Sequence, residues 1–513
     1  MIGSRLLSSI GIALLLPLLS QCTIAPKPGE KVVSVARPAP DSGALVKASR
    51  SLARDRPAGH SSFLLLEEAQ EALDWRLALI DSAQSSVDIQ LYLWRDGYTS
   101  ALLFDRVLRA ADRGVRVRIL VDDFLLSTDE KMIATLCRHH PDLDIRIFNP
   151  TRLRGNPIGA SAEMILNFQH LNRRMHNKTW TADRTFSIVG GRNVSDHYFG
   201  LDPKYNFIDL DVLACGPVVA DISDGFDLFW NASQSYPAAL FSKRGKLEEV
   251  NEFRQDLRKH LDDEQDGLLQ SYPITPRNWS RELAGLKSQV ATGRARFVQD
   301  HPEIEEDDRQ VVTSLLEMVG PKEELIFVSA YLLPSRGALA RLEEGARSGV
   351  EVRFLAPTLA ANNQPLVHGH YRKKRRPIMT KGGQLYEMKA DPGSTVRSLA
   401  DVAPVRSEVV CLHMKTVTGE RRRCFIGSLN FDPRAARINT ESGLLIDSPE
   451  LTGEVHDILE EILEEACWEL VLDEQGRITW HANGVSRGTE PPAPFMKRLV
   501  ARISGLLPVG SQL

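Results

Sequence analysis

The stretches MHNKTWTADRTFSIVGGRN (residues 175–193) and LHMKTVTGERRRCFIGSLN (residues 412–430) share one pattern. In each stretch a Lys follows a His by two positions, and an acidic residue follows the same His by seven. Each stretch then closes on a Gly-containing turn and an Asn. A pattern that recurs with matched offsets predicts two similar lobes, each of which contributes half of one site.

The sequence around each copy follows the same order of elements. Strand, helix and strand are expected at 85–94, 100–115 and 116–123 in the first half, and at 323–333, 336–350 and 351–357 in the second. Parallel strands joined by a helix are typical of α/β proteins. We therefore expect two tandem α/β/α lobes, at 59–290 and 291–490, related by a pseudo-twofold axis with the site at their interface.

The spacing within each motif predicts which side chains act together. Residues two apart in a strand point to the same face, so His176 projects with Lys178, and His413 projects with Lys415. If the two lobes meet about a pseudo-twofold axis, these four side chains converge on one cleft. They are our candidate catalytic residues.

Two imidazoles and two ammoniums suit chemistry on a phosphodiester. One neutral imidazole attacks phosphorus and forms a phosphohistidine, while the other, protonated, donates to the leaving alcohol. The ammoniums and the amides of Asn193 and Asn430 can bind the phosphate oxygens, so we expect no metal or other cofactor. The alternative is a repeat that lost its chemistry in one half, which the presence of both His and both Lys argues against.

The two motifs resemble the phospholipase D superfamily, whose signature is H-x-K-x4-D followed by G-S-x-N. HNKTWTAD fits fully, but Gly191 replaces the usual Ser, and Glu420 replaces the usual Asp in the second copy. The resemblance implies that Asp183 and Glu420 support the local structure, and that Ser428 of the intact GSLN binds phosphate with the asparagines. By analogy we assign the nucleophile to His176 and the acid to His413.

An orienting carboxylate is expected beside each imidazole, because it fixes the tautomer and the direction of the ring. Alignment of the two repeats sets Asp209 against Glu441, and we take these two as the orienting residues. Asp211 competes with Asp209 for this role. A surface or turn carboxylate is the alternative for either position.

Beyond the motifs, the body resembles the bacterial cardiolipin synthases, and most closely the C type. The resemblance rests on GGRNVSDHYFG, GSLNFDPRAARINTE, HGHYRKKRRPI and GLLPVGSQL, and it runs from about residue 60 to the end. It implies transfer of a phosphatidyl group from phosphatidylethanolamine or phosphatidylglycerol to phosphatidylglycerol. A hydrolase that releases phosphatidic acid, a secreted nuclease of the same superfamily and a non-catalytic binding protein are the alternatives.

The dense basic run YRKKRRP (residues 371–377) precedes the second motif. We expect Tyr371, Lys373 and Arg375 to hold anionic lipid headgroups beside the cleft. A solvated basic loop and a nucleic-acid patch are the alternatives for this run. No nucleic-acid partner is expected, because the chain has 63 Lys and Arg against 67 Asp and Glu and a net charge of −4.

The two ends of the chain point to a membrane surface in the bacterial cell envelope. Residues 1–22 have the form of a secretory leader that ends in a lipoprotein-like LSQC, which makes Cys22 a candidate for lipidation. A plain signal or a short uncleaved anchor is the alternative. Residues 23–58 are expected to be a flexible linker.

Residues 491–513 are expected to form a basic amphipathic helix. Phe495, Leu499 and Ile503 repeat at four-residue steps, and Lys497, Arg498 and Arg502 fall between them. Such a helix can lie on an anionic membrane. A helix docked on the core of the protein with an exposed basic face is the alternative.

Overall fold

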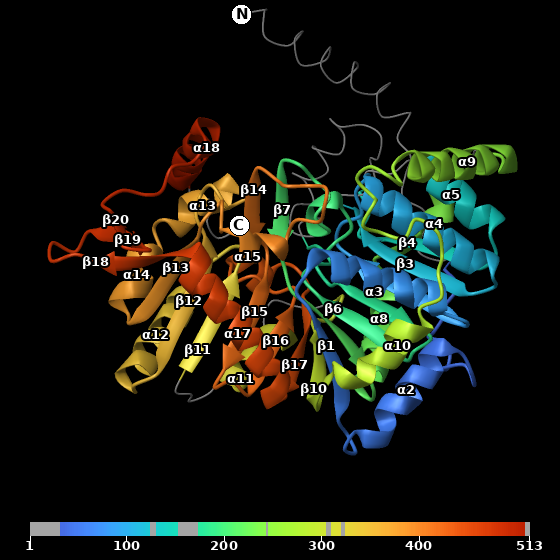
Figure 1. Cartoon of the computed structure of the whole chain (residues 1–513), viewed down its shortest axis with the longest axis horizontal. Helices are drawn as coiled ribbons and strands as arrows, with labels where there is room; N and C mark the ends of the chain where they lie inside the picture. Colours follow the sequence, from blue (N-terminus) through green and yellow to red (C-terminus); the bar gives the residue numbers. More distant parts are fainter. Residues whose placement is uncertain are drawn as a thin grey trace, which may run out of the picture.

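The computed structural model describes residues 31–123, 130–151, 173–242, 245–303, 309–319 and 324–507. The expected leader at 1–22, with Cys22, lies outside the described residues. Within them, no helix is both long enough and apolar enough to span a bilayer. Two lobes lie side by side, the first drawn in blue to green and the second in yellow to red (Figure 1).

The first lobe is built on strands in the spatial order β9-β4-β3-β2-β5-β6-β8-β1. Strands β2, β3 and β4 run parallel, and their other neighbours are antiparallel. The strands are β1 (Ser61–Leu66), β2 (Ser86–Leu91), β3 (Arg116–Asp122), β4 (Leu143–Phe148), β5 (Thr179–Ala182), β6 (Phe186–Gly190), β8 (Asp211–Cys215) and β9 (Ser235–Pro237). The helices are α2 (Ala44–Asp55), α3 (Ala69–Ser82), α4 (Tyr98–Asp112), α5 (Glu130–His139), α8 (Val218–Trp230), α9 (Leu247–Asp263) and α10 (Ser280–Gly285).

The second lobe repeats this order as β10-β17-β16-β15-β11-β12-β13-β18, followed by β19 and β20. Its strands are β10 (Ala291–Gln299), β11 (Glu324–Ser329), β12 (Glu351–Pro357), β13 (Gly383–Met388), β15 (Lys415–Gly419), β16 (Arg423–Gly427), β17 (Ser442–Asp447), β18 (Cys467–Leu472), β19 (Ile478–Ala482) and β20 (Val485–Arg487). Its helices are α11 (Gln310–Val319), α12 (Arg336–Arg347), α13 (Pro365–Tyr371), α14 (Arg375–Thr380), α15 (Ser394–Ser398), α16 (Pro433–Arg437), α17 (Pro449–Ala466) and α18 (Phe495–Leu506).

One continuous sheet joins the lobes. β1 pairs antiparallel with β10 at Ser61↔Gly293, and β10 continues into the second lobe through β17. Helices α8 and α17 cover this junction, and their apolar residues share one core cluster with β1, β8, β10 and β17. A separate pair of short strands, β7 (Tyr205–Ile208) and β14 (Val409–Leu412), crosses between the lobes in parallel.

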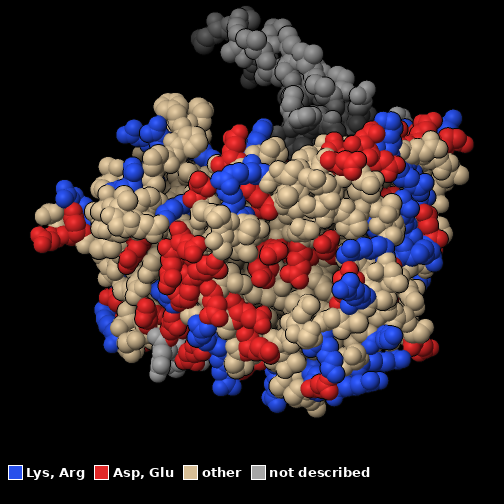
Figure 2. All heavy atoms as spheres, viewed as in Figure 1, with Lys and Arg blue, Asp and Glu red and all other residues tan. Residues whose placement is uncertain are grey.

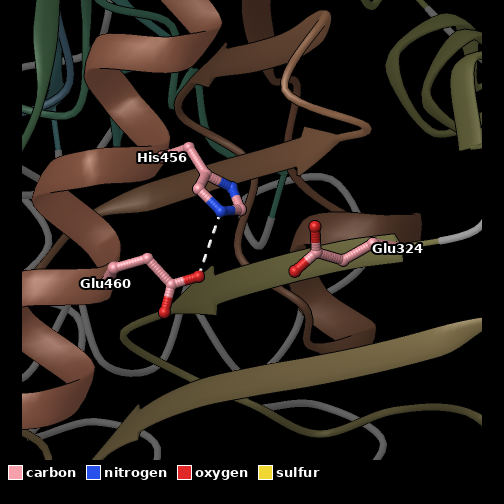
Figure 3. Close-up of side chains that lie close together, drawn as sticks. All are labelled: Glu324, His456 and Glu460. Atoms are coloured by element: carbon pink, nitrogen blue, oxygen red, sulfur yellow. Dashed lines mark ion pairs between the residues drawn. The ribbon is translucent and has the colours of Figure 1, made fainter.

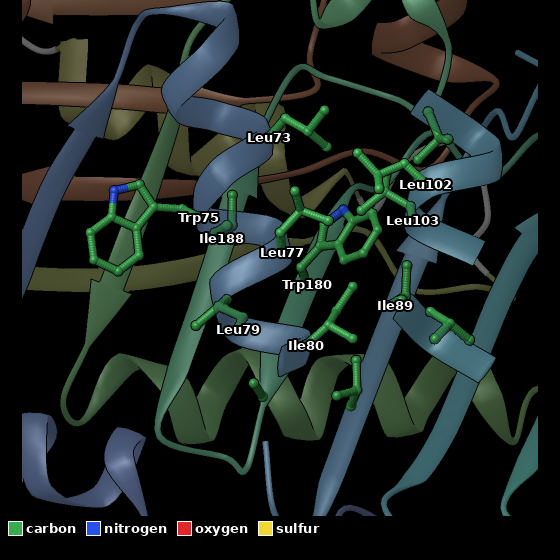
Figure 4. Packing of buried hydrophobic residues seen from close by; sticks show 14 of the residues in the cluster. Leu73, Trp75, Leu77, Leu79, Ile80, Ile89, Leu102, Leu103, Trp180 and Ile188 are labelled. Atoms are coloured by element: carbon green, nitrogen blue, oxygen red, sulfur yellow. The ribbon is translucent and has the colours of Figure 1, made fainter. Parts of the chain in front are cut away.

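The cores form because each sheet presents apolar side chains to its helices. In the first lobe, Leu73, Leu77 and Ile80 of α3 are fully buried over Trp180 of β5 and Ile188 of β6 (Figure 4). Burial of each such aliphatic side chain contributes roughly 1.5–3 kcal/mol.

The turns that feed the central strands are the same in both lobes. Gly114 ends the α4–β3 connection with φ 85°, and Gly349 ends the α12–β12 connection with φ 84°. The position just after a helix often adopts a left-handed backbone conformation. Gly is the usual residue there, because it has no side chain to clash with the backbone. The duplication seen in the sequence is therefore a duplication of backbone geometry.

The structure corrects the expectation of a flexible linker at 23–58 over its described part. Helix α2 packs on α10 and α3, and Leu45, Val46, Ala48 and Leu52 are buried. Residues before it are held on α8, where the Ala36 amide donates to Asp227 at 2.6 Å. The apolar spacing in this short helix was hidden by the Pro, Ala, Ser and Lys around it.

We expect Leu45→Ala to destabilise the protein, because Leu45 is fully buried. The loss should be about 2–5 kcal/mol, visible as a lower urea midpoint. Lys47→Ala, at an exposed position of the same helix, is the matched control and should change stability by less than about 0.5 kcal/mol. Equal midpoints for the two variants would mean that α2 does not belong to the folded core.

Candidate active site

Each His-x-Lys motif is positioned by the backbone of the opposite lobe. Met175 forms a bridge with Thr440, and the His176 amide donates to the Thr440 carbonyl at 2.9 Å. On the other side β14 pairs with β7, and the His413 amide donates to the Ile208 carbonyl at 2.9 Å. The residue that follows each of these acceptors is a carboxylate.

These two carboxylates hold the imidazoles crosswise. Nδ1 of His176 lies 2.8 Å from a Glu441 carboxylate oxygen, and Nδ1 of His413 lies 2.5 Å from an Asp209 carboxylate oxygen. Each ring is thus fixed through its Nδ1 by an acid from the other lobe. The sequence singled out both acids but could not show which ring each would meet.

Asp211, the competitor of Asp209, has a different place in the structure. Its carboxylate lies 2.8 Å from the Arg76 guanidinium and 3.4 Å from that of Arg192, and all three groups are buried. Asp211 therefore compensates two buried cations in the core and does not contact the imidazoles.

The first motif has Gly191 where the second has Ser428, and the neighbouring carboxylates explain this difference. A Cβ on Gly191 would lie 2.1 Å from Oδ1 of Asp209, so the Asp209 carboxylate occupies the space that a Ser would need. In the other half the Ser428 hydroxyl is fully buried and donates to Glu441. Ser428 thus supports the orienting acid, which corrects the expectation that it binds phosphate.

Asp183 and Glu420 both lie in the hairpin turns that follow their motifs. Both have positive φ, 51° for Asp183 and 55° for Glu420. The Asp183 carboxylate accepts hydrogen bonds from three backbone amides at the start of β2, those of Gln84, Ser85 and Ser86. Its contacts are those of a residue that supports the hairpin.

The two lysines are buried next to the imidazoles. Lys178 Nζ donates to the His176 carbonyl at 2.6 Å, and Lys415 Nζ donates to the His413 carbonyl and lies 2.6 Å from Nδ1 of the same ring. Burial lowers the pKa of Lys178 to about 7 and that of Lys415 to about 8. Both ammoniums are therefore close to losing their protons near neutral pH, and neither lysine is among the residues that line the cavity beside the imidazoles.

The two imidazoles are also buried, and this burial decides their protonation state. Burial and the neighbouring lysines lower the pKa of both rings, for His413 to about 3 even though Asp209 opposes the shift. Both rings are therefore neutral at pH 7 when no anion is bound. A phosphate in the cavity would raise these pKa values, because its negative charge favours the imidazolium.

The orienting acids are electrostatically unequal. Burial raises the pKa of Glu441 to about 8. Burial alone would also raise the pKa of Asp209, but the charge of Lys415 and the contacts with His413, which include a hydrogen bond, outweigh it and lower that pKa. The two halves of the site thus hold their imidazoles in different charge environments.

Both imidazoles open into one cavity of about 360 Å³. Asn193 and Asn430 also line this cavity, as expected of phosphate ligands. Further lining residues are Tyr92, Leu93, Arg95, Ser195, His197, Tyr198, Tyr205, Phe207, Tyr331, Asn363, Gln364, Asp432, Arg434 and Asn439. The structure therefore brings together both His and both Asn from the two lobes.

Tyr198 is a site residue that the motif search did not find. Its hydroxyl lies 3.3 Å from Nε2 of His413 and accepts a hydrogen bond from Asn193 at 3.0 Å. The corresponding position five residues after Asn430 is Ala435, so comparison of the repeats gives no signal for Tyr198. Tyr92 packs edge-on against His176, at 4.9 Å between ring centroids.

The expected headgroup residues Tyr371, Lys373 and Arg375 do not line the cavity. Tyr371 and Arg375 are buried and bind the Glu387 carboxylate at 2.7 and 2.6 Å, and Lys373 donates to the Gly505 carbonyl. The polar groups of these three side chains thus bind other parts of the second lobe. The prediction that this run binds headgroups is therefore wrong for Tyr371 and Arg375.

A second cluster of ligand-type side chains lies away from the cavity. His456 and Glu460 of α17 approach Glu324 of β11, with His456 Nε2 3.0 Å from a Glu460 oxygen (Figure 3). Both carboxylates are also bound by the Arg353 guanidinium, at 2.6 Å for Glu460. The cluster is an ion-pair network that links α17, β11 and β12.

Fold and site together define a protein of two phospholipase D-like lobes. Residues 77–230 and 316–463 match the family described as "Cardiolipin synthase, PLD-like domain". The chain is 33% identical over 461 residues to cardiolipin synthase C of Escherichia coli (strain K12), which covers 88% of this chain and 96% of that protein. The chain therefore belongs to the phospholipase D-like cardiolipin synthase family.

More distant relatives agree with this assignment. Cardiolipin synthase A of Pseudomonas putida (strain GB-1) is 25% identical over 432 residues, 83% of this chain and 73% of that protein. Phosphatidylserine synthase of Haemophilus influenzae Rd KW20 has the same fold, with a TM-score of 0.55 and 14% identity over 83% of this chain and 92% of that one. The family, the tandem α/β fold and the expectation of an enzyme are confirmed.

Asp209→Asn and Asp211→Asn should have different effects, the first on the orientation of the His413 ring and the second on the stability of the fold. Asp209→Asn removes the acid that fixes His413, so phospholipid turnover should fall by about 10²–10⁴-fold. Asp211→Asn leaves Arg76 and Arg192 undercompensated and should cost about 3–5 kcal/mol in chemical denaturation. The reverse pattern would show that Asp211, not Asp209, serves the imidazole.

The site should bind a dianion more weakly as pH rises. Below their lowered pKa values of about 7 and 8, Lys178 and Lys415 are charged, and above them they lose the charge that attracts the anion. The dissociation constant for sulfate, measured by calorimetry, should rise at least about tenfold between about pH 6 and pH 9. In a Lys178→Met, Lys415→Met double variant this dependence should disappear, and an affinity that stays constant in the native protein would contradict the assignment.

Proposed function

We propose that the protein is a cardiolipin synthase that transfers a phosphatidyl group to the glycerol hydroxyl of phosphatidylglycerol. The donor is phosphatidylethanolamine or a second phosphatidylglycerol. The observation that carries the proposal is the pair of imidazoles in one cavity, each with Nδ1 held by an acid of the other lobe. The similarity to cardiolipin synthases along most of the chain supports the choice of substrate.

In the first step Nε2 of His176 attacks phosphorus of the donor. An N–P bond forms while the bond from phosphorus to the headgroup oxygen breaks, and Nε2 of His413 gives its proton to that oxygen. Ethanolamine or glycerol leaves, and the phosphatidyl group remains on His176. Glu441 and Asp209 hold the two Nδ1 atoms throughout.

In the second step the glycerol hydroxyl of phosphatidylglycerol enters. Nε2 of His413 accepts its proton, the oxygen attacks phosphorus, and the N–P bond to His176 breaks. Cardiolipin leaves and both rings return to their first state. Lys178, Lys415 and the amides of Asn193 and Asn430 stabilise the charge on the phosphoryl oxygens in both steps.

The different partners of the rings support His176 as the nucleophile and His413 as the acid. Nε2 of His413 has two polar partners that can exchange a proton with it, the Tyr198 hydroxyl at 3.3 Å and Lys415 Nζ at 3.2 Å. The His176 ring is held through Nδ1 by Glu441, which presents its Nε2 as the attacking atom. We also propose that the protein works at a membrane surface of the cell envelope, with Cys22 as a lipid anchor.

The proposal is tested with purified protein and labelled phosphatidylglycerol, with and without phosphatidylethanolamine. Cardiolipin together with free glycerol or ethanolamine is the expected result. Phosphatidic acid as the sole product would replace the proposal with a hydrolase, since water would then be the acceptor. Inertness toward lipids with cleavage of DNA would identify a nuclease.

His176→Ala and His413→Ala should each abolish cardiolipin formation, and His139→Ala, at an exposed position, should not. A phosphatidyl ester of p-nitrophenol separates the two roles, because nitrophenolate leaves without a proton. His413→Ala should still release nitrophenolate from this ester, whereas His176→Ala should not. Release by His176→Ala alone would reverse the order of the two imidazoles.

A further inference from the structure

Helix α18 is attached to the second lobe through its small residues. Ala501, Ser504 and Gly505 are buried against α13. The backbones come so close that a Cβ on Gly369 would lie 2.2 Å from the Ala501 carbonyl oxygen. Lys497 completes the attachment. The helix is therefore a fixed part of the lobe.

The opposite side of α18 is apolar and uncovered. Phe495 is 67% exposed, Ile503 53% and Leu506 83%. With Met496 and Leu499 they form one stripe, because residues three and four apart share a face of a helix. We call these five residues the α18 stripe. Six of the fifteen exposed large hydrophobic side chains in the described part of the chain lie at 495–507, so the stripe is a local concentration.

Two cations lie beside the α18 stripe. Arg498 and Arg502 are exposed and one turn apart, between the stripe and the buried face. In Figure 2 the projection formed by α18 is largely tan with blue spheres along one side. An apolar face bordered by arginines matches the boundary between acyl chains and anionic headgroups.

The attachment of α18 reaches the rim of the catalytic cavity. Lys497 Nζ donates to the Ala360 and Asn362 carbonyls, at 2.8 and 3.0 Å. The next two residues, Asn363 and Gln364, line the cavity, and α13 begins directly after them. β14, which leads into His413, lies at the same end of the molecule as α18 (Figure 1).

We propose that the α18 stripe docks on the surface of an anionic phospholipid bilayer and places the rim of the catalytic cavity against the headgroups. The proposal rests on the proposed function, because it takes the bilayer to be the source of the substrate. A helix of 12 residues is too short to cross the hydrocarbon core, so it lies in the interface plane. The close contact with α13 would transmit this position to the cavity.

A fluorescent probe tests the docking in the full chain, independently of activity. An environment-sensitive dye is attached at Ile503→Cys, with Val485→Cys of β20 as the matched control, since both side chains are 53% exposed. With phosphatidylglycerol vesicles, emission from position 503 should shift to the blue and be quenched by brominated acyl chains, while position 485 stays unchanged. Phosphatidylcholine vesicles should give a smaller shift, and Arg498→Glu with Arg502→Glu should reduce the difference.

Turnover tests the consequence for catalysis. Leu499→Asp with Ile503→Asp should lower turnover on phosphatidylglycerol vesicles at least about tenfold, because two apolar anchors are lost. The same variant should keep about the wild-type turnover on short-chain phosphatidylglycerol below its critical micelle concentration. Leu247→Asp with Val485→Asp, two exposed apolar positions elsewhere, should behave like the wild type on both substrates.

Three results would overturn the docking proposal. These are an unchanged dye at position 503 in the presence of vesicles, an equal loss of turnover on short-chain lipid, or a dye shift that follows protein concentration without lipid. The last would identify a second copy of the chain as the occupant. A protein that shifts the dye on vesicles yet processes no phospholipid would sink the proposed function and leave the docking intact.

Discussion

The site depends on one arrangement: each imidazole is held by a carboxylate from the other lobe. Neither lobe alone contains a His with its orienting acid. The junction that keeps the lobes in register therefore acts directly on catalysis. It consists of the β1–β10 pairing, the crossing pair β7–β14, and the helices α8 and α17 that cover the common core. A shift of this junction by one residue would move both acids off both rings.

The duplication is geometric, but the chemistry of the two halves has diverged. Asp209 is short and lies tightly over Gly191, whereas the longer Glu441 is met by the Ser428 hydroxyl. Lys415 also approaches the His413 ring itself, and Tyr198 contacts its Nε2. Identical halves would hold two identical imidazoles. The differences give the His413 ring a hydroxyl partner in Tyr198 and place the two rings in unlike surroundings.

The sequence predicted the parts of the protein that repeat. The tandem lobes, the two His-x-Lys pairs and the acids at 209 and 441 could be found because each position has a counterpart. Tyr198 could not, since its counterpart is Ala435, and its role depends on a contact across the interface. The prediction that the basic run at 371–377 binds headgroups was wrong for Arg375, because charge in the sequence does not show that this residue pairs with Glu387 and Glu490 inside the lobe. Helix α2 was missed because four buried positions in a short segment carry a weak signal.

Because each imidazole is held by a carboxylate of the other lobe, the site cannot form until late in translation of the chain. A chain that has emerged only through the first lobe carries His176 and Asp209 but neither Glu441 nor His413. Folding of that lobe, however complete, leaves His176 without the Glu441 carboxylate and leaves the Asp209 carboxylate without the His413 ring. Catalytic competence therefore arises late, once β17 and the second core have formed around residue 441. Fragments that end before this point, whether from early termination or from proteolysis, would lack Glu441 and so could not orient His176.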